Sequence, residues 1–261
     1  MNCLIETALL THGLRSIANE ELAQSWHCPD AILAWVDGGE LKLGPIGEYL
    51  PFRERSEELI RIDCDHLEEA LQTGASGALT ASGTMAVCRR LDIPMAITCG
   101  MGGIGDLRGE ELCPDLPALM NIPVALISTS PKDMLDRLAT LDWLRRHGVH
   151  TAGEPCTGYL FCGEPVALEL PLSSCNNEAA VRRLTANGGL LLLNPIPEKE
   201  RVQDRSILVD AIKAGKQAEA EGHYYHPAAN GEIDRRTDGY SSRIQLESIQ
   251  QNYLLAKSIM D

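Results

Sequence analysis

The sequence predicts an α/β protein in which a mostly parallel central sheet is covered by helices on both faces, a three-layer α/β/α arrangement. Short segments rich in leucine, isoleucine and valine alternate with amphipathic segments along the whole chain. The chain also contains no internal repeat and no low-complexity tract. Its 261 residues, 44% of them hydrophobic, are enough for one large core, so we expect a single domain over residues 1–261.

Charge and cysteine content narrow the classes of partner and compartment. The formal net charge of −14 disfavours a nucleic acid polymer as partner, because phosphate-backbone binding needs a basic face. No segment resembles a signal peptide, and no uncharged stretch approaches the length of a membrane span. The nine cysteines contain no C-x-x-C pair, which favours reduced thiols in the core. We therefore expect a soluble cytoplasmic protein that does not bind membranes.

The N-terminal segment places a carboxylate inside an apolar strand. We expect a strand over Leu4–Thr11 and a helix over about Ile17–Trp26. Glu6 lies within that strand, where burial would raise its pKa into the range of a general acid. A salt bridge with a neighbouring cation is an equally good interpretation. Residues 31–43 then have the pattern of a β-hairpin with a turn at Asp37-Gly38-Gly39.

A polar cluster follows the next strand, which we expect over Leu59–Asp63. Asp63-Cys64-Asp65-His66 contains metal-ligating residue types, but Asp65 is also a good N-cap for a helix over His66–Thr73, and we favour capping. A further helix is expected from Ser82 to Leu91 and a strand from Pro94 to Thr98.

A glycine-rich segment follows that strand. Gly100–Gly105 matches G-x-G-x-x-G, but neither the helix nor the acidic residue that a dinucleotide site requires is present. We therefore predict a loop whose backbone approaches an anion, such as a phosphate, with Arg108 as a bidentate partner.

Three carboxylates lie close together in the sequence after the glycines: Glu110, Glu111 and Asp115. Clustered carboxylates suit a hard cation such as Mg²⁺ or Mn²⁺. Asp115 is also a plausible N-cap for a short helix over Leu116–Met120. The spacing does not separate these two interpretations.

Lys132 lies where a strand is followed by a helix. Pro123–Ile127 reads as a buried parallel strand, and we expect Lys132 on the first turn of an amphipathic helix over Lys132–His147. Ligands of open α/β sheets bind beyond the carboxyl ends of the strands, so this amine is a candidate for chemistry. The local sequence alone favours a solvated side chain.

The C-terminal part continues the alternation. We expect short strands over residues 149–153, 160–162 and 166–170, a helix over Asn176–Ala186 and an apolar strand over Gly188–Leu193. Asn194-Pro195-Ile196-Pro197-Glu198 then predicts a rigid loop over the crevice that contains Lys132. Two helices, over about Asp204–Glu221 and Ser241–Met260, follow.

Taken in order, these segments resemble the pseudouridine-5′-phosphate glycosidases, also called the indigoidine synthase A-like family. The resemblance covers nearly the whole chain, and its most specific parts are Asn194–Glu198 and the ordered pair of Glu6 and Lys132. Further matching segments are Ile5-Glu6-Thr7, Thr11-His12-Gly13, Ser82-Gly83-Thr84-Met85, Thr98 with Gly100–Gly103, Arg108-Gly109, Asp115-Leu116, Pro131-Lys132 and Leu135-Asp136.

The resemblance implies a homotrimer that uses Mn²⁺ (or Mg²⁺) and reversibly cleaves pseudouridine 5′-phosphate into uracil and ribose 5-phosphate. It makes Lys132 the nucleophile that forms a covalent adduct at the sugar C1, and Glu6 the proton donor. Glu111 and Asp115 would bind the metal. The implied substrate-binding residues are Arg61, Ala81, Thr98, Arg108, Cys113, Pro114, Asp115 and Asn194.

Several positions depart from the family pattern. Arg61 replaces a lysine, Cys64 and Asp65 replace a basic pair, Arg243 replaces an asparagine, and His226-Pro227-Ala228 replaces Thr-Pro-Phe. A changed pocket around retained catalytic residues favours a specialised relative that acts on another C-glycoside or works in the synthetic direction. A sugar-phosphate-binding paralogue without turnover is a further alternative. An NAD-dependent oxidoreductase is the least favoured.

Overall fold

The computed structural model describes residues 1–105, 113–186 and 188–260. Its main sheet has the strand order β10-β11-β8-β6-β1-β2-β5-β4, with β3 also paired to β2. The pairs from β10 through to β2 are parallel, whereas β3 and β5 run antiparallel to β2. The mostly parallel sheet is therefore confirmed, with a reversal at β2.

The bounds of the sheet strands follow the apolar segments of the sequence. They are β1 (Cys3–Ile5), β2 (Leu33–Asp37), β3 (Glu40–Gly44), β4 (Ile60–Ile62), β5 (Gly77–Leu79), β6 (Met95–Ile97), β8 (Ala125–Ser128), β10 (His150–Gly153) and β11 (Leu190–Leu193). A second, two-stranded sheet pairs β7 (Gly100–Met101) with β9 (Ser130–Pro131).

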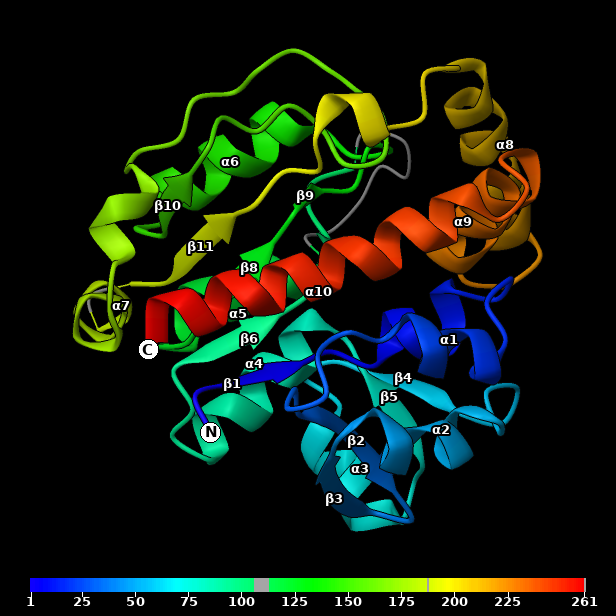
Figure 1. Cartoon of the computed structure of the whole chain (residues 1–261), viewed down its shortest axis with the longest axis horizontal. Coiled ribbons are helices and arrows are strands. Elements are labelled where there is room, and N and C mark those ends of the chain that lie inside the picture. The colour runs from blue at the N-terminus through cyan, green and yellow to red at the C-terminus, as the bar shows by residue number, and fades with distance from the viewer. Residues whose placement is uncertain (106–112, 187, 261) are drawn as a thin grey trace.

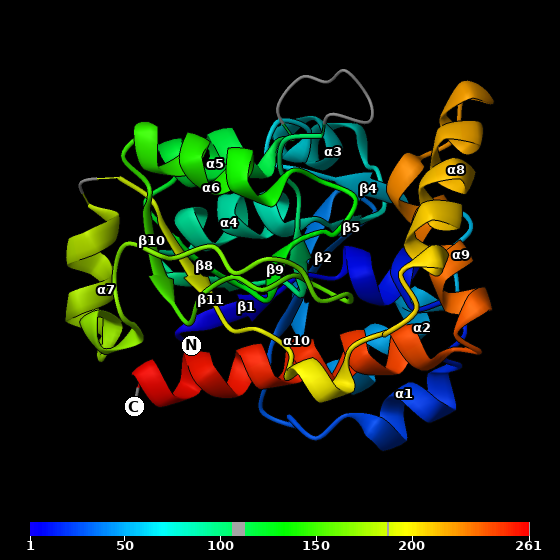
Figure 2. The same ribbon diagram turned by 90° about the horizontal axis from the view of Figure 1, so that it is seen from above.

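Helices cover both faces of the main sheet, as Figure 2 shows. One layer holds α3 (Leu67–Thr73), α4 (Ala81–Arg90), α5 (Asp115–Asn121) and α6 (Arg137–Arg146), and the other holds α1 (Asn19–Ser25), α2 (Ile46–Arg53) and α10 (Tyr240–Met260). α7 (Glu178–Thr185) lies at the β10 edge (Figure 1). The three-layer prediction is confirmed. No helix in the described part of the chain is long and apolar enough to cross a membrane.

Two buried clusters, one on each face of the sheet, form the core. Leu4 and Leu126 belong to one cluster and Ile5 and Ile127 to the other, since neighbouring residues of a strand point to opposite faces. The nine cysteines are free, and five of them are buried: Cys28, Cys88, Cys99, Cys156 and Cys175. This agrees with the expectation of reduced thiols in the core.

The first strand is shorter than the sequence predicts. β1 ends at Ile5, and a π-helix over Leu9–Gly13 replaces the second half of the predicted strand. Beyond the end of β1, the hydroxyl of Thr7 donates to the carbonyl oxygen of Ala34 and accepts from the backbone N–H of Leu79. These bonds tie Thr7 to β2 and β5, whereas the partner strand β6 ends at Ile97.

Lys132 does not lie on a helix, contrary to the prediction. α6 begins at Arg137, where Asp136 is the N-cap and accepts from the backbone N–H of Ala139. Lys132 instead follows β9, and its own N–H donates to the carbonyl of Met101 at 3.1 Å. The backbone N–H of Lys132 is therefore bonded to the β7 strand and is not part of a helix.

The C-terminal half has fewer strands and more helices than predicted. The predicted strands at 160–162 and 166–170 are isolated bridges in the structure. Three helices, α8 (Ser206–Ala220), α9 (Tyr225–Arg236) and α10, occupy the region where two were expected. α9 was not expected from the sequence; Pro227 lies in its first turn, where a helix tolerates proline.

Candidate functional site

Chain segments far apart in sequence meet at the carboxyl ends of the parallel strands. Glu6 follows β1 and donates its backbone N–H to the carbonyl of Ile97 in β6. Thr98 follows β6, and its hydroxyl donates to Glu6 Oε1 at 2.7 Å. The Glu6 side chain is only 6% exposed. Glu6 is therefore a buried carboxyl group held by Thr98, and no salt bridge involving it is found among the described residues.

The segment after Lys132 is fixed by the half-buried carboxylate of Asp133. Asp133 Oδ1 accepts from the backbone N–H of Tyr159, and Oδ2 accepts from those of Leu160 and Phe161. These bonds hold Tyr159 against the strand ends, where its hydroxyl donates to Gln245 of α10. The residue next to Lys132 thereby positions part of the wall around the lysine.

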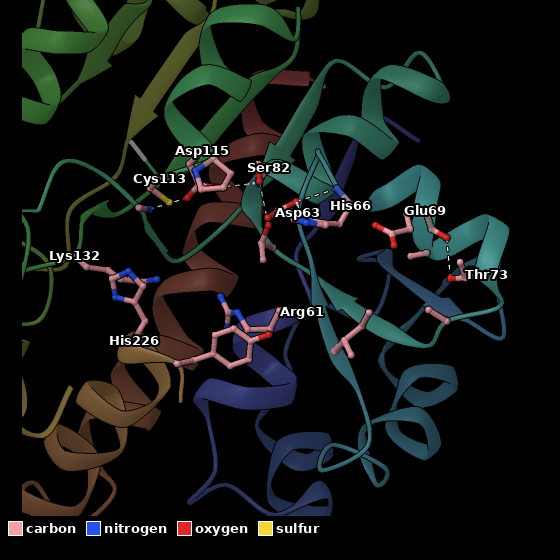
Figure 3. A pocket seen from close by; sticks show the side chains of 17 residues that line it. Arg61, Asp63, His66, Glu69, Thr73, Ser82, Cys113, Asp115, Lys132 and His226 are labelled. Atoms are coloured by element: carbon pink, nitrogen blue, oxygen red, sulfur yellow. Dashed lines mark hydrogen bonds and ion pairs between the residues drawn. The ribbon is translucent and has the colours of Figure 1, made fainter. Parts of the chain in front are cut away.

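Two cavities meet at Lys132. We call the first the outer cavity; its volume is about 500 Å³ and it runs past Arg61 to Glu69 and Thr73, as Figure 3 shows. Its lining is Ile60, Arg61, Asp63, His66, Glu69, Ala70, Thr73, Ala75, Thr80, Ser82, Gly102, Cys113, Pro114, Asp115, Lys132, Tyr224 and His226.

The second, which we call the inner cavity, has a volume of about 30 Å³. Its lining is Glu6, Ala8, Leu9, His12, Gly13, Arg61, Gly100, Lys132, Tyr159, His226, Pro227 and Asn230. Arg61, Lys132 and His226 line both cavities, so they mark the passage between them. Glu6 and Lys132 therefore face one common space.

Burial changes the protonation of both candidate catalytic groups. Burial raises the pKa of Glu6 to about 7, against the opposing effects of Thr98 and Lys132. Burial, together with the nearby charge of Arg61, lowers the pKa of Lys132. The two shifts favour a protonated carboxyl group beside a neutral amine, which are the forms that a proton donor and a nucleophile require.

Cys113 is a weaker candidate for a nucleophile than its place in the outer cavity suggests. Burial and the charge of Asp115 raise the pKa of the Cys113 thiol to about 12. A thiol rather than a thiolate is therefore present near neutral pH, and the thiolate is the reactive form.

Asp115 does not cap its own helix. Its Oδ1 accepts from the backbone N–H of Ser82 at 3.0 Å, and its Oδ2 accepts from that of Gly102 at 2.7 Å. It therefore joins the start of α4 to the glycine segment. The N-cap of α5 is Pro114, which makes no side-chain cap bond, so of the two interpretations left open for Asp115 the N-cap is excluded.

The predicted metal site is only partly within the described residues. Glu110 and Glu111 lie outside them, and the described residues contain no group of three or more ligating side chains that could hold a metal ion. Both oxygens of Asp115 already accept backbone hydrogen bonds. The described residues alone therefore do not form a site for Mn²⁺ or Mg²⁺.

The cluster after β4 forms a turn before α3 and not the helix cap that the sequence favours. Asp63 Oδ1 accepts from the backbone N–H groups of Asp65 and His66 and is 2.7 Å from His66 Nδ1. The N-cap of α3 is His66, which makes no side-chain cap bond, so the capping prediction for Asp65 is wrong. The contact with Asp63 raises the pKa of His66.

Most predicted substrate-binding residues lie around the two cavities. Arg61, Cys113, Pro114 and Asp115 line the outer cavity. Thr98 contacts Glu6, and Ala81 lies between Thr80 and Ser82, which also line the outer cavity. Arg108 lies outside the described residues.

Asn194 lies in another place. It lines a separate hollow against α10, and its amide donates to Asn252 Oδ1 at 3.0 Å. Asn252 in turn donates to the carbonyl of Thr98 at 2.8 Å. Asn194 thus supports the strand ends through Asn252 of α10. Within the described part of the chain, Asn194 lines neither of the two cavities at Lys132. The predicted loop over the crevice is therefore wrong.

Several residues of the cavity walls were not predicted from the sequence to have a role. His12 belongs to a matching motif, and His226 stands at a departure from the family pattern, so both carried a signal that could have been followed. Tyr159 carried no such signal. Its place depends on the backbone contacts of Asp133, which are not visible in the sequence.

Curated relatives match almost the whole chain. The pseudouridine-5′-phosphate glycosidase of Petrotoga mobilis is 26% identical over 98% of this chain and 89% of its own length. The protein of the same name from Escherichia coli K12 is 26% identical over 98% and 88%, and that of Saccharopolyspora erythraea is 28% identical over 98% and 90%.

Two solved structures share the fold. The prealnumycin C-glycosynthase AlnA, in complex with ribulose 5-phosphate, superposes with a TM-score of 0.77 at 21% identity over 98% of this chain and 91% of that one. An indigoidine synthase A-like protein from Thermotoga maritima superposes with a TM-score of 0.78 at 18% identity, with the same coverage. The family model described as "Indigoidine synthase A like protein" matches residues 4–260. This chain therefore belongs to the indigoidine synthase A-like family.

Proposed function

We propose that this protein is an enzyme that cleaves or forms the C–C glycosidic bond between ribose 5-phosphate and a base, through a covalent adduct between Lys132 and the sugar. The substrate would be pseudouridine 5′-phosphate or a related C-glycoside. The names of the curated relatives and of the structural neighbour AlnA support this class of reaction.

The observation that carries the proposal is that Glu6 and Lys132, far apart in the sequence, line the same inner cavity. A carbon–carbon bond to a base has no heteroatom leaving group. Its cleavage needs an electron sink at the sugar C1 and a proton for the departing carbon. A neutral lysine supplies the first after attack, and a protonated glutamic acid supplies the second.

The chemistry proposed for cleavage uses these two side chains in turn. The Lys132 amine attacks C1, the bond from C1 to the ring oxygen breaks, and that oxygen leaves as a hydroxyl with the proton that the amine loses. The nitrogen lone pair then forms an imine as the bond to the base breaks, and Glu6 delivers its proton to the departing carbon. Water hydrolyses the imine and releases ribose 5-phosphate.

A larger base, joined in the synthetic direction, is the second candidate, and the outer cavity favours it. A volume of about 500 Å³ falls within the range of about 300–1,000 Å³ that is typical of small-molecule pockets. The cavity continues beyond Arg61 to Glu69 and Thr73 (Figure 3), which leaves room for an aglycone that extends away from Lys132.

We propose separately that the protein binds a divalent cation through Glu111 and Asp115. Oxygen ligands of this type suit Mn²⁺ or Mg²⁺. We expect that dialysis against a chelator lowers the rate of bond cleavage and that added Mn²⁺ restores it. An unchanged rate after complete metal removal would refute the requirement.

Reductive trapping tests the central proposal. Ribose 5-phosphate and cyanoborohydride should label Lys132 with one reduced sugar phosphate, located by peptide mass spectrometry. Lys132→Ala should abolish the label and the conversion of pseudouridine 5′-phosphate to uracil. Lys199→Ala is the matched control, because Lys199 is exposed (83%) and lines neither cavity, and this variant should behave like the wild type.

Labelling of another lysine, or none, would refute the adduct mechanism. If ribose 5-phosphate raises the melting temperature but no base tested is released or joined, the protein is a sugar-phosphate-binding paralogue. A panel of aromatic acceptors, compared with uracil in the synthetic direction, distinguishes the two candidate substrate classes.

A further inference from the structure

The inner cavity, which Glu6 and Lys132 both line, is too small for a sugar. Its volume is about 30 Å³. One water molecule needs about 10–15 Å³ of such space, whereas a sugar ring needs far more than the cavity offers. A bound sugar therefore lies in the outer cavity, which also reaches Lys132. Of the two cavities, Glu6 lines only the inner one, so something small must connect Glu6 to the sugar.

No hydrogen bond or ion pair joins Glu6 to Lys132 in the described structure. The charge of each still acts on the pKa of the other, beside the larger effect of burial, so the two groups are near each other. Glu6 Oε1 accepts from Thr98, and no described residue donates to Oε2. The Lys132 amine likewise has no hydrogen-bond partner within the described part of the chain. A molecule in the inner cavity can therefore bridge the two side chains.

A water molecule fits this bridging position in size and in chemistry. Buried waters make about two to four hydrogen bonds with polar groups that otherwise lack a partner. Neither Glu6 Oε2 nor Lys132 Nζ is among the polar atoms that are enclosed without a partner, so both are open to the cavity that they line. Arg61, His226 and Asn230 are further polar side chains on its wall.

We propose that the inner cavity holds one water molecule between Glu6 and Lys132, and that this water releases the sugar from Lys132 with Glu6 as its general base. The inference rests on the proposed function for the covalent adduct. It gives Glu6 a second role after the departure of the base, and it gives the inner cavity a part in the reaction.

In the first step the water carries a proton from Glu6 to the departing carbon. It gives one of its own protons to that carbon and takes the proton of Glu6 in return. Glu6 is then a carboxylate, the base has left with its new proton, and C1 of the sugar is bound to Lys132 as a protonated imine.

In the second step the water attacks C1. Glu6 Oε2 takes one proton of the water while the double bond between C1 and nitrogen becomes a single bond, which gives a carbinolamine. Glu6 then returns a proton to the Lys132 nitrogen and takes that of the new hydroxyl group as the carbon–nitrogen bond breaks. Ribose 5-phosphate leaves with a carbonyl group at C1. Lys132 is neutral and Glu6 is protonated, as at the start.

Oxygen exchange tests the second step alone, because it needs no base. Each formation and hydrolysis of the imine replaces the C1 oxygen of ribose 5-phosphate by an oxygen from the solvent. The wild type should therefore remove ¹⁸O from ribose 5-phosphate labelled at C1, which mass spectrometry measures. Glu6→Gln should exchange at least about a hundredfold more slowly, since general acid–base catalysis contributes about 10²–10⁴ in rate. Glu198→Gln, at an exposed position, is the matched control and should exchange like the wild type.

Ala8→Val tests the place of the water. Ala8 is buried and lines the inner cavity but not the outer one, so the larger side chain takes space from the water and leaves the sugar site intact. Oxygen exchange should fall. Lys132 should still be labelled after long incubation with ribose 5-phosphate and cyanoborohydride, which captures even a slowly formed imine. Ala118→Val is the matched control, because Ala118 is buried and lines neither cavity.

The outcomes separate this inference from the proposed function. Equal exchange rates in Glu6→Gln and the wild type would overturn the role of Glu6, and full exchange in Ala8→Val would overturn the place of the water. A wild type that is labelled on Lys132 but exchanges no oxygen would overturn the inference and leave the adduct mechanism standing. A wild type without any label on Lys132 would refute the proposed function and the inference with it. Thermal unfolding of each variant reports whether the fold is retained.

Discussion

The carboxyl group of Glu6 lies in surroundings that oppose its ionisation, so the stability of the protein depends on pH through this residue. Its pKa is about 7 in the folded state against 4.5 for an unperturbed glutamate. Between these values the folded state binds more protons than the unfolded state. The stabilisation is therefore complete below pH 4.5 and is lost as the pH rises through about 7.

We expect Glu6→Gln to remove this dependence, because an amide does not ionise. The free energy of unfolding of the variant, relative to the wild type, should rise by about 3 kcal/mol from acidic to mildly alkaline pH, since each pKa unit corresponds to about 1.4 kcal/mol. Denaturant unfolding at several pH values measures it. Glu198→Gln, at an exposed position, should follow the wild type at every pH.

If the free energies of unfolding of the wild type and Glu6→Gln changed in parallel across the whole pH range, the raised pKa of Glu6 would be contradicted.

Lys132 changes the stability in the opposite direction at higher pH. Its pKa is lowered in the folded state, so the folded protein binds fewer protons there and gains stability as the pH rises towards 10.5.

The candidate catalytic residues could be predicted from the sequence to different degrees. Glu6 and Lys132 were singled out because an ionisable group near a strand end is unusual and because of their order in the family pattern. Their common cavity depends on three-dimensional packing and does not follow from local spacing.

At the scale of elements, the small sheet of β7 and β9 determines where Lys132 lies. Gly100 pairs with Ser130 and Met101 with Pro131, and the N–H of Lys132 continues the pairing to Met101. The glycines are needed for close approach. A Cβ at Gly102 would lie 2.0 Å from Cys113 Sγ and 3.1 Å from Asp115 Oδ2.

We therefore predict that Gly102→Ala displaces Cys113 and weakens the contact of Asp115 with residue 102. Overpacking of this kind costs about 1–3 kcal/mol of unfolding free energy, and trapping of sugar phosphate on Lys132 should fall with it. Both are measured on the same preparation, by denaturant unfolding and by mass spectrometry.

Gly47→Ala is the matched control, because Gly47 lies within α2 and a Cβ there meets nothing within 4 Å. This variant should be as stable as the wild type or up to about 1 kcal/mol more stable, since alanine is the better helix former. Full stability and trapping in Gly102→Ala would show that the close packing at Gly102 is not required.

Sequence patterns predicted the apolar core strands with continuous hydrophobic runs and missed several elements fixed by polar contacts. The strands around Leu4, Ile97, Leu126 and Leu191 were expected because an apolar run identifies a buried strand. The π-helix depends on hydrogen bonds of Thr7 to two other strands, and the loop at Lys132 depends on pairing with Met101. Such long-range partners leave no periodic signal.

For the whole molecule, the resemblance to the family adds the expectation of a homotrimer, and we propose that state for this chain in solution. Light scattering coupled to size-exclusion chromatography should give three times the mass of the 28.4 kDa chain. A single mass of one chain, unchanged over a wide concentration range, would contradict it. Because the net charge is −14, the measurement belongs at moderate ionic strength, where repulsion between subunits is screened.

The C-terminal helix α10 has a consequence for the order of events during synthesis. Asn252 joins the carbonyl of Thr98 to Asn194, and Thr129 is bonded to Ser248 of the same helix. The ends of strands that are synthesised early are thus stabilised by a helix that is synthesised late. A nascent chain that already contains Glu6 and Lys132 still lacks the helix that supports the strand ends, so Lys132 reaches its final surroundings only after α10 has been synthesised.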